Sequence, residues 1–259
     1  MTLTIRLCTW NIQLGLQLHT ILDALRHNPN FTGLDLLALQ EASIHHQRED
    51  ARTIAATLGP AYESYQVTAH LLKGHVQANA LVWNTERVRV RAQDSIRLPS
   101  AHEGRLTRTE RTILRALPSQ PRSSLVVEGE LGTERFRIYV AHLDVVGFAH
   151  KRQQFGHLLK DARLRPPVDL TILAGDLNTF KLCARPTWSQ LTAAAQAEGF
   201  QDLTGEIRWT HAVRPLRLKQ KLDAILIRHA GPLEYRAWSL DIPGSDHIPV
   251  LAELTLAQS

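Results

Sequence analysis

The hydrophobic pattern of the chain consists largely of short apolar runs that each end in polar residues. The clearest run lies between Pro166-Pro167 and Gly175 and is followed by Asp176 and Asn178. An apolar run of this length predicts a strand that is buried on both faces. Asp176 and Asn178 are one residue apart, so we expect them to point the same way and to offer two oxygen ligands to a hard cation such as Mg²⁺. The alternative interpretation is an Asx turn that only satisfies its own backbone.

Polar residues recur wherever a strand is predicted to end. Apolar alternation over residues 3–7 leads to Asn11, a nearly continuous apolar run over 34–39 leads to Glu41, and alternation over 136–140 leads to His142. The candidate site residues at strand ends and in the last predicted hairpin are Asn11, Glu41, His142, Asp176, Asn178, Asp223, Asp246 and His247. A single such residue usually satisfies nearby backbone groups, but the repetition favours one shared site.

The remaining pattern predicts many strands and few helices. Helical spacing of apolar residues predicts helices around residues 18–25, 51–58, 155–162 and 188–195. Short strands are predicted over residues 62–68, 77–83, 87–98, 111–117 and 123–131, and further strands follow residue 223. So many strands do not fit one sheet of βαβ units, and they predict two packed sheets with helices outside. We find no domain boundary, and we expect residues 1–259 to form a single domain.

Composition narrows the class of protein. The 259 residues are 44% hydrophobic and 21% charged, as is typical of a soluble globular enzyme. No apolar run approaches transmembrane length, and the first residues do not resemble a secretory signal. We therefore expect a cytoplasmic protein, with secretion left open if a signal was trimmed. Two cysteines provide no disulfide framework, and the net charge of +5 favours anionic partners.

The order and spacing of the polar motifs resemble the endonuclease/exonuclease/phosphatase superfamily, which has the DNase-like fold. The specific part of the resemblance is Ser245-Asp246-His247 together with Gly175-Asp176-Leu177-Asn178, and weaker features are Asn79 and Arg152. The motifs extend over essentially the whole chain. The resemblance implies a four-layer αββα sandwich of two packed mixed β-sheets flanked by helices, with the strand ends converging on one metal-dependent phosphoesterase site.

The resemblance also implies a metal centre. Glu41 is expected to be the principal ligand of Mg²⁺, with Mn²⁺ as a substitute. Asn11 is expected to assist it, and Asp246 is expected to hold either the metal or His247. A cation suits the chemistry because an anionic phosphodiester repels hydroxide until its charge is neutralised.

The catalytic roles implied by the resemblance fall on five residues. Asp176 would orient or deprotonate the attacking water, while Asn178 would hydrogen-bond that water or a phosphate oxygen. His142 would donate to a phosphate oxygen or to the leaving group, with Asp223 as its carboxylate partner. His247 is the second candidate base, because an adjacent carboxylate raises the pKa of a histidine and fixes its tautomer.

Departures from the family pattern indicate which branch of the superfamily the chain resembles. Abasic-site repair enzymes carry a lysine two residues after the metal glutamate, where this chain has Ser43, and an asparagine where His142 stands. The chain therefore resembles the histidine-type branch, which includes DNase-like nucleases, sphingomyelinases and inositol-phosphate phosphatases. Thr210-His211-Ala212 replaces the common Thr-Phe-Pro of the family, which leaves that loop without an assigned role.

The leading functional interpretation is a Mg²⁺-dependent nuclease that acts on DNA or RNA. Basic residues that would contact phosphates are Arg105, Arg108, Arg111, Arg214, Arg217, Lys219 and Lys221, unless they form only a solvated face. The runner-up acts on a lipid head group, as a sphingomyelinase does, or on a small phosphoester, and residues 143–148 could provide an exposed apolar loop for it. A non-catalytic binding module is a third interpretation, against which the complete set of motifs argues. No obligate protein partner is inferred.

Overall fold

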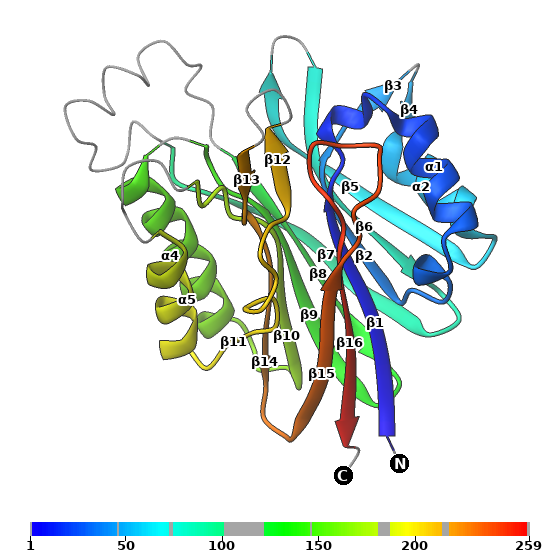
Figure 1. Cartoon of the computed structure of the whole chain (residues 1–259). Coiled ribbons are helices and arrows are strands. Elements are labelled where there is room, and N and C mark those ends of the chain that lie inside the picture. Colours follow the sequence, from blue (N-terminus) through cyan, green and yellow to red (C-terminus); the bar gives the residue numbers. More distant parts are fainter. Residues whose placement is uncertain are drawn as a thin grey trace.

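The computed structural model describes residues 2–45, 47–72, 75–100, 122–145, 147–180, 187–213 and 218–257. Its centre is a pair of six-stranded β-sheets that face each other (Figure 1). The first sheet has the order β15 (Leu233–Ser239), β16 (Val250–Ala257), β1 (Thr2–Asn11), β2 (Leu36–Ala42), β6 (His75–Asn84) and β5 (Tyr62–Leu72). The second has the order β11 (Gln201–Asp202), β14 (Asp223–His229), β10 (Leu170–Asp176), β9 (Glu134–His142), β8 (Ser123–Leu131) and β7 (Val88–Arg97).

Each sheet is mixed. Strands β1 and β2 run parallel, as do β9 and β10, whereas the other pairings are antiparallel. Two short ribbons lie outside the main sheets, formed by β3 (Ile44–His45) with β4 (Arg48–Glu49) and by β12 (His211–Val213) with β13 (Leu218–Gln220). The parallel pairs bring the carboxyl ends of neighbouring strands to the same edge of each sheet.

Helices cover the outer faces of both sheets (Figure 1). Helices α1 (Leu18–His27) and α2 (Asp50–Leu58) share an apolar cluster with the first sheet, and α4 (Phe148–Leu164) and α5 (Thr187–Ala197) share one with the second. Single-turn helices occupy Gln13–Gly15 (η1) and Pro29–Phe31 (η2). The predicted four-layer αββα sandwich is therefore confirmed, and among the described residues no helix is long and apolar enough to cross a membrane.

The four layers explain why the central strands are almost entirely apolar. In β2, Leu36 and Ala38 face the core between the sheets, whereas Leu37 and Leu39 face the core under α1 and α2. Both faces of the strand are covered, so its sequence is almost continuously apolar. The same holds for β10, with Ile172 on the inner core and Leu173 on the outer one.

Gly175 allows the central strands of the second sheet to approach closely. Its φ is +147°, and a Cβ at this position would lie 1.9 Å from the carbonyl oxygen of Ala141 on β9. Only glycine fits there without displacing backbone. The glycine that ends the apolar run in the sequence is therefore required for the packing that sets Asp176 beside His142.

Most predicted elements are present with small changes of boundary. The strand expected to start at residue 168 runs over Leu170–Asp176, and the one expected at 62–68 extends to Leu72. The strand predicted over residues 111–117 lies outside the described residues. Cys8 is buried in the apolar cluster under α1 and α2.

Candidate active site

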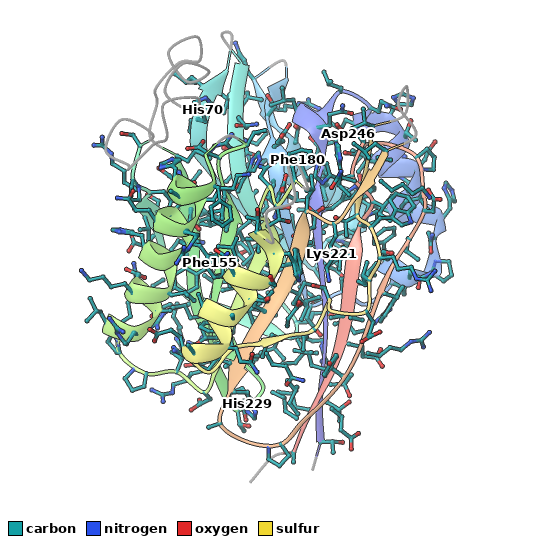
Figure 2. All side chains as sticks on the ribbon, turned by 60° about the vertical axis from the view of Figure 1, so that its left-hand side comes forward. His70, Phe155, Phe180, Lys221, His229 and Asp246 are labelled. Atoms are coloured by element: carbon teal, nitrogen blue, oxygen red, sulfur yellow. The ribbon has the colours of Figure 1, made fainter. Side chains whose placement is uncertain are left out.

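Polar side chains from both sheets meet at the end of the sandwich where β1, β2, β9 and β10 finish. In the second sheet, Asp176 lies directly opposite His142 on β9 and opposite Asp223 on β14. Paired residues on adjacent strands present their side chains on the same face. Figure 2 shows Asp246 and Phe180 at this end of the molecule and His229 at the opposite end.

Asn11 joins the two sheets at this site. Its Nδ2 donates to Glu41 Oε1 at 3.2 Å and to Asp176 Oδ2 at 3.0 Å. Its Oδ1 accepts a hydrogen bond from the backbone nitrogen of Gln13 at 3.0 Å, which fixes the orientation of the amide. Asn11 therefore holds one carboxylate from each sheet at a defined separation.

Glu41 is aimed into the site by an irregularity in β2. Its φ is 53°, in the left-handed region, and the pairing of β2 with β6 shifts register between Leu39 and Ala42. A bulge of this kind re-aims a side chain that regular pairing would point elsewhere, and left-handed backbone in a residue other than glycine often occurs at functional sites. Glu41 Oε1 consequently lies 3.7 Å from His142 Nε2.

His142 and Asp176 are buried and close together. His142 Nε2 lies 3.5 Å from Asp176 Oδ2. Burial, with contributions from Arg122 and His247, holds the pKa of His142 well below its ordinary value, so this imidazole is neutral near pH 7. Burial also raises the pKa of Asp176 to about 6; the charge of His247 opposes this increase and that of Asp223 adds to it.

Asp223 is the partner of His247. His247 Nδ1 donates to Asp223 Oδ2 at 2.8 Å, and its Nε2 lies 3.7 Å from Asp176 Oδ2. Burial acts to lower the pKa of His247, but the carboxylates of Asp223 and Asp176 outweigh it and raise the pKa to about 10. The expected pairing of Asp223 with His142 is therefore wrong. Thr210 positions Asp223, because its Oγ1 accepts a hydrogen bond from the Asp223 backbone nitrogen at 3.0 Å.

Asp246, expected to hold either the metal or His247, also contacts a histidine that was not expected. Its Oδ2 lies 3.6 Å from Nε2 of His211 on β12, and ligand atoms of Asp246, His211 and His247 all lie within 4.8 Å of one another. Burial acts to raise the pKa of Asp246, but His211 and the charge of His247 hold it below the ordinary value. Ser245 anchors this turn, since its Oγ donates to the backbone oxygen of Asn11 at 2.7 Å.

Asp176 and Asn178 form the Asx turn of the alternative interpretation, and one oxygen of Asp176 is directed into the site. Asp176 Oδ1 accepts a hydrogen bond from the backbone nitrogen of Asn178 at 2.8 Å, which is an Asx turn, while its Oδ2 faces Asn11 and the two histidines. The side-chain nitrogen of Asn178 donates to Leu143 O at 2.8 Å. Asn178 has a φ of 50°, so a second site residue adopts left-handed backbone.

A buried ionic network beside His142 gave no signal in the sequence. Arg122 Nε donates to Asp144 Oδ1 at 2.6 Å, and His150 Nε2 donates to Asp144 Oδ2 at 2.6 Å. Arg122 is only 7% exposed, and its Nη1 has no partner in the part of the chain that the structure describes. Its charge affects the pKa of His142, so it lies within electrostatic reach of the site. In the sequence, an arginine just before a strand cannot be distinguished from an exposed arginine, because only the structure shows that it is buried.

His211 is a second residue that sequence reasoning left without a role. Its ring centroid lies 4.6 Å from that of His247 and 5.6 Å from that of Phe180. Together with Asp246, Gln13 and Gln17 it lines a cavity of about 310 Å³. The sequence feature that could have indicated His211 is the departure from the family pattern at Thr210-His211-Ala212.

The predicted substrate-binding cations are described only in part. Arg105, Arg108, Arg111, Arg214 and Arg217 lie outside the described residues. Lys219 is exposed on β13, with its Nζ 3.7 Å from the ring centroid of Trp209. Lys221 Nζ lies 4.0 Å from the ring centroid of Trp188 and donates to the backbone oxygen of Thr204. In the loop after β9, Leu143 is buried, whereas Val145 is 50% exposed.

The donor set fits a hard divalent cation. Atoms of Asp176, Asp223 and His247 lie within 4.8 Å of one another, and Glu41 joins Asp176 through Asn11. Asp223 Oδ1 is buried without a partner among the described residues. Crowded carboxylate oxygens with an amide nearby are the groups that Mg²⁺ prefers.

Carboxylates and histidines therefore meet at the strand ends of a two-sheet sandwich. A family model described as the Endonuclease/Exonuclease/phosphatase family matches residues 8–247. The chain belongs to this family and is a metal-dependent phosphoesterase, a hydrolase of ester bonds. The resemblance seen in the motifs is thereby confirmed.

Several solved structures share this fold. A family protein from Bacteroides vulgatus is 18% identical with a TM-score of 0.73, covering 98% of this chain and 99% of that one. A family protein from Bacteroides thetaiotaomicron is 13% identical with a TM-score of 0.70, covering 99% and 96%. TDP2 from D. rerio, solved as a complex with a single-strand DNA product, is 15% identical with a TM-score of 0.71, covering 97% and 98%. No match was found among curated proteins.

Proposed function

We propose that this protein is a Mg²⁺-dependent phosphodiesterase that cleaves DNA or RNA. One observation carries the proposal. Asp176 Oδ2 lies 3.0 Å from Asn11 Nδ2, 3.5 Å from His142 Nε2 and 3.7 Å from His247 Nε2. A single carboxylate oxygen thus has an amide and two imidazoles around it, which places a candidate general base beside hydrogen-bond donors for a phosphate.

The protonation state of each of these side chains suggests its role in hydrolysis. With a pKa of about 6, Asp176 is ionised near neutral pH and can accept the proton of the attacking water. His247, with a pKa of about 10, keeps its proton and stabilises the additional negative charge on the phosphate in the transition state. Asp223 holds His247 in this state, and neutral His142 is placed to hydrogen-bond a phosphate oxygen or the leaving group. Asn178 orders the turn after Asp176.

Glu41 would hold the Mg²⁺ with Asp246 as a second carboxylate, and Asn11 would join them through Oδ1 once its amide turns away from the backbone nitrogen of Gln13. The bound cation would neutralise phosphate oxygens and so reduce their repulsion of the attacking water. Arg122 supplies a further cation, since its buried Nη1 has no partner among the described residues. Arginine suits this position because its planar guanidinium binds phosphate oxygens in pairs.

The choice of a nucleic acid rests on charge and aromatic groups beside the site. The ribbon of β12 and β13 carries His211 at the site, and Lys219 on it lies over the ring of Trp209. An aromatic ring with adjacent cations is the arrangement that binds unpaired bases and their phosphates. The formal charge of +5 supports a polyanionic substrate.

An activity panel tests the proposal directly. The protein is incubated with Mg²⁺ or Mn²⁺ and with plasmid DNA, single-stranded DNA, RNA, sphingomyelin and a chromogenic bis-phosphodiester. We expect hydrolysis of a nucleic acid that stops in excess chelator and returns when Mg²⁺ is restored. Glu41→Gln should abolish this activity, whereas Glu253→Gln, which removes a carboxylate paired with Arg6 on the first sheet, should not. Full turnover in excess chelator would contradict the proposal.

A lipid head group or a small phosphoester is the second candidate substrate. The exposed side chain of Val145, in the loop that follows His142, favours it. Hydrolysis of sphingomyelin or of the chromogenic ester without cleavage of any nucleic acid would establish this alternative. The residues proposed for chemistry would be unchanged.

A further inference from the structure

Three metal-ligating side chains meet at the edge of the candidate active site. Ligand atoms of His211, Asp246 and His247 all lie within 4.8 Å of one another, with His211 Nε2 and Asp246 Oδ2 3.6 Å apart. In a tetrahedral zinc site with bonds of about 2.0–2.2 Å, ligand atoms are about 3.3–3.6 Å apart. Small adjustments of these side chains would therefore suffice to surround one ion.

The backbone holds this group together from two distant segments. His211 and His247 form a β-bridge, and the backbone nitrogen of Ala212 donates to Asp246 O at 2.9 Å. His211 is 7% exposed, and its Nδ1 is buried without a partner in the described part of the chain. A buried imidazole held rigidly beside a carboxylate is already oriented for a ligand, so little ordering is needed on binding.

His247 has one nitrogen available for an ion. Its Nδ1 is bound to Asp223 at 2.8 Å, which leaves Nε2. A carboxylate on the far nitrogen is the usual support for a metal-ligating histidine, because it fixes the ring and makes it more basic. The carboxylates of Asp176 and Asp246 near the same ring add a negative potential that attracts a cation.

The site also has room for a remaining ligand. The adjoining cavity of about 310 Å³ is lined by His211 and Asp246 and by the side chains of Gln13 and Gln17. It offers space for a water molecule and a route of entry from solvent. Three protein ligands with an open fourth position are common in exchangeable zinc sites.

We propose that His211, Asp246 and His247 bind a borderline transition ion, represented by Zn²⁺, and that this ion blocks hydrolysis. Two imidazoles and one carboxylate favour Zn²⁺ over Mg²⁺, which prefers oxygen ligands. The block follows because the ion displaces the proton of His247 Nε2, the atom that faces Asp176, and releases it to solvent, so His247 no longer serves as the charged donor. The binding of Zn²⁺ does not depend on the proposed function, whereas the inhibition of hydrolysis by Zn²⁺ rests on it.

Binding is tested with the metals alone on the full chain. Zn²⁺ is titrated calorimetrically in saturating Mg²⁺, and Co²⁺ is added separately to detect the intense visible absorption of a four-coordinate site. His211→Gln and His211→Asn should each weaken Zn²⁺ binding by about 100-fold or more, since loss of even an outer-shell partner costs about 10–100-fold. His229→Gln is the matched control, because His229 Nε2 also lies 3.6 Å from a carboxylate, that of Glu134, but at the opposite end of the molecule (Figure 2).

The block is measured as the rate with Zn²⁺ divided by the rate of the same variant without it. The wild type and His229→Gln should lose activity at the Zn²⁺ concentrations that saturate the site, and His211→Gln should require far more. Equal Zn²⁺ affinity in His211→Gln and the wild type would overturn the site. Absence of the four-coordinate Co²⁺ absorption in the wild type would also overturn the site. This measurement does not depend on the folding of any variant. A protein that binds Zn²⁺ through His211 but hydrolyses nothing would retain the site and refute the proposed function.

Discussion

Asp223 hydrogen-bonds His247 at 2.8 Å, although the two residues come from different segments and neither is the sequence neighbour of the other. His247 continues the chain of contacts to Asp176 at 3.7 Å. The charged state of His247 is therefore set first by Asp223 at the start of its strand and then by Asp176, while Asp246 beside it in the sequence contributes less. In the proposed mechanism, this arrangement makes Asp223 a positioning residue for Asp176.

Asp223→Asn should lower the pKa of His247 from about 10 towards the ordinary histidine value, because it removes the nearest carboxylate. The turnover number should fall by about two to four orders of magnitude as the charged donor is lost. NMR titration of the His247 ring and kcat measured against pH test the two effects. Asp246→Asn is the contrasting variant and should lower the pKa of His247 less. A larger change in Asp246→Asn would contradict the pairing described here.

Asp144 should make the stability of the fold depend on pH. Burial acts to raise the pKa of Asp144, but His150 and Arg122 outweigh it and hold the pKa below the ordinary value. A depressed folded pKa means that the stabilisation is complete above the unfolded pKa of about 3.9 and is lost as pH falls through the folded value. The free energy of unfolding, measured in urea at pH 6 and at more acidic pH, should show this loss in the wild type.

Asp144→Asn should reduce that acid-dependent loss and lower the free energy of unfolding at pH 6 by about 3 kcal/mol, since it leaves buried Arg122 without its ionic partner. Asp23→Asn is the control, because the Asp23 side chain on α1 is 67% exposed. An Asp144→Asn variant as stable as the wild type at pH 6 would show that the network contributes nothing.

Gly175→Ala should destabilise the fold by about 3 kcal/mol or more, because the new methyl group would overlap the backbone of Ala141. Gly156→Ala is the matched control within α4, where a Cβ would meet nothing within 4 Å. That substitution should stabilise the protein by about 1 kcal/mol through helix propensity. Thermal unfolding of both variants gives the comparison, and equal effects would refute the steric argument.

The sequence predicted the layers because burial on both faces imposes a pattern on each strand. Leu36 to Leu39 must be apolar when one face meets the other sheet and the other meets helices, so the run is visible without a structure. The strand-end positions of Asn11 and Asp176 followed from the same pattern. Side-chain partners did not, since the choice of Asp223 or Asp246 for His247 depends on how the turn at Ser245 folds back.

Burial of charged groups also has no local signature. Arg122 and His150 are polar residues in an ordinary sequence context, and only the packing of α4 on the second sheet makes them a buried pair around Asp144. The left-handed backbone of Glu41 likewise depends on the shift of register against β6. Such features depend on contacts between distant segments, which a single sequence does not contain.

The basic stretch of sequence over residues 208–221 provides the test of substrate size. Arg214, Arg217 and Lys219 should contact phosphates that flank the scissile bond only when the substrate is a polymer. Each phosphate contact releases condensed counterions and adds about 0.7–0.9 to the slope of log affinity against log salt. Replacing all three by glutamine should therefore lower kcat/KM for DNA or RNA and flatten its salt dependence by up to about 2–3. Hydrolysis of the chromogenic bis-phosphodiester should be nearly unchanged.

A second triple variant separates this local effect from overall charge. Arg26, Arg52 and Lys160 are exposed on α1, α2 and α4, and their replacement by glutamine removes the same charge from the helical faces. Since these cations lie outside residues 208–221, the salt dependence of nucleic-acid cleavage should keep its slope. Equal losses on both substrates in the first triple variant would indicate damage to the site itself. No loss on either would identify Arg214, Arg217 and Lys219 as part of a solvated face and favour the small phosphoester or lipid head group as substrate.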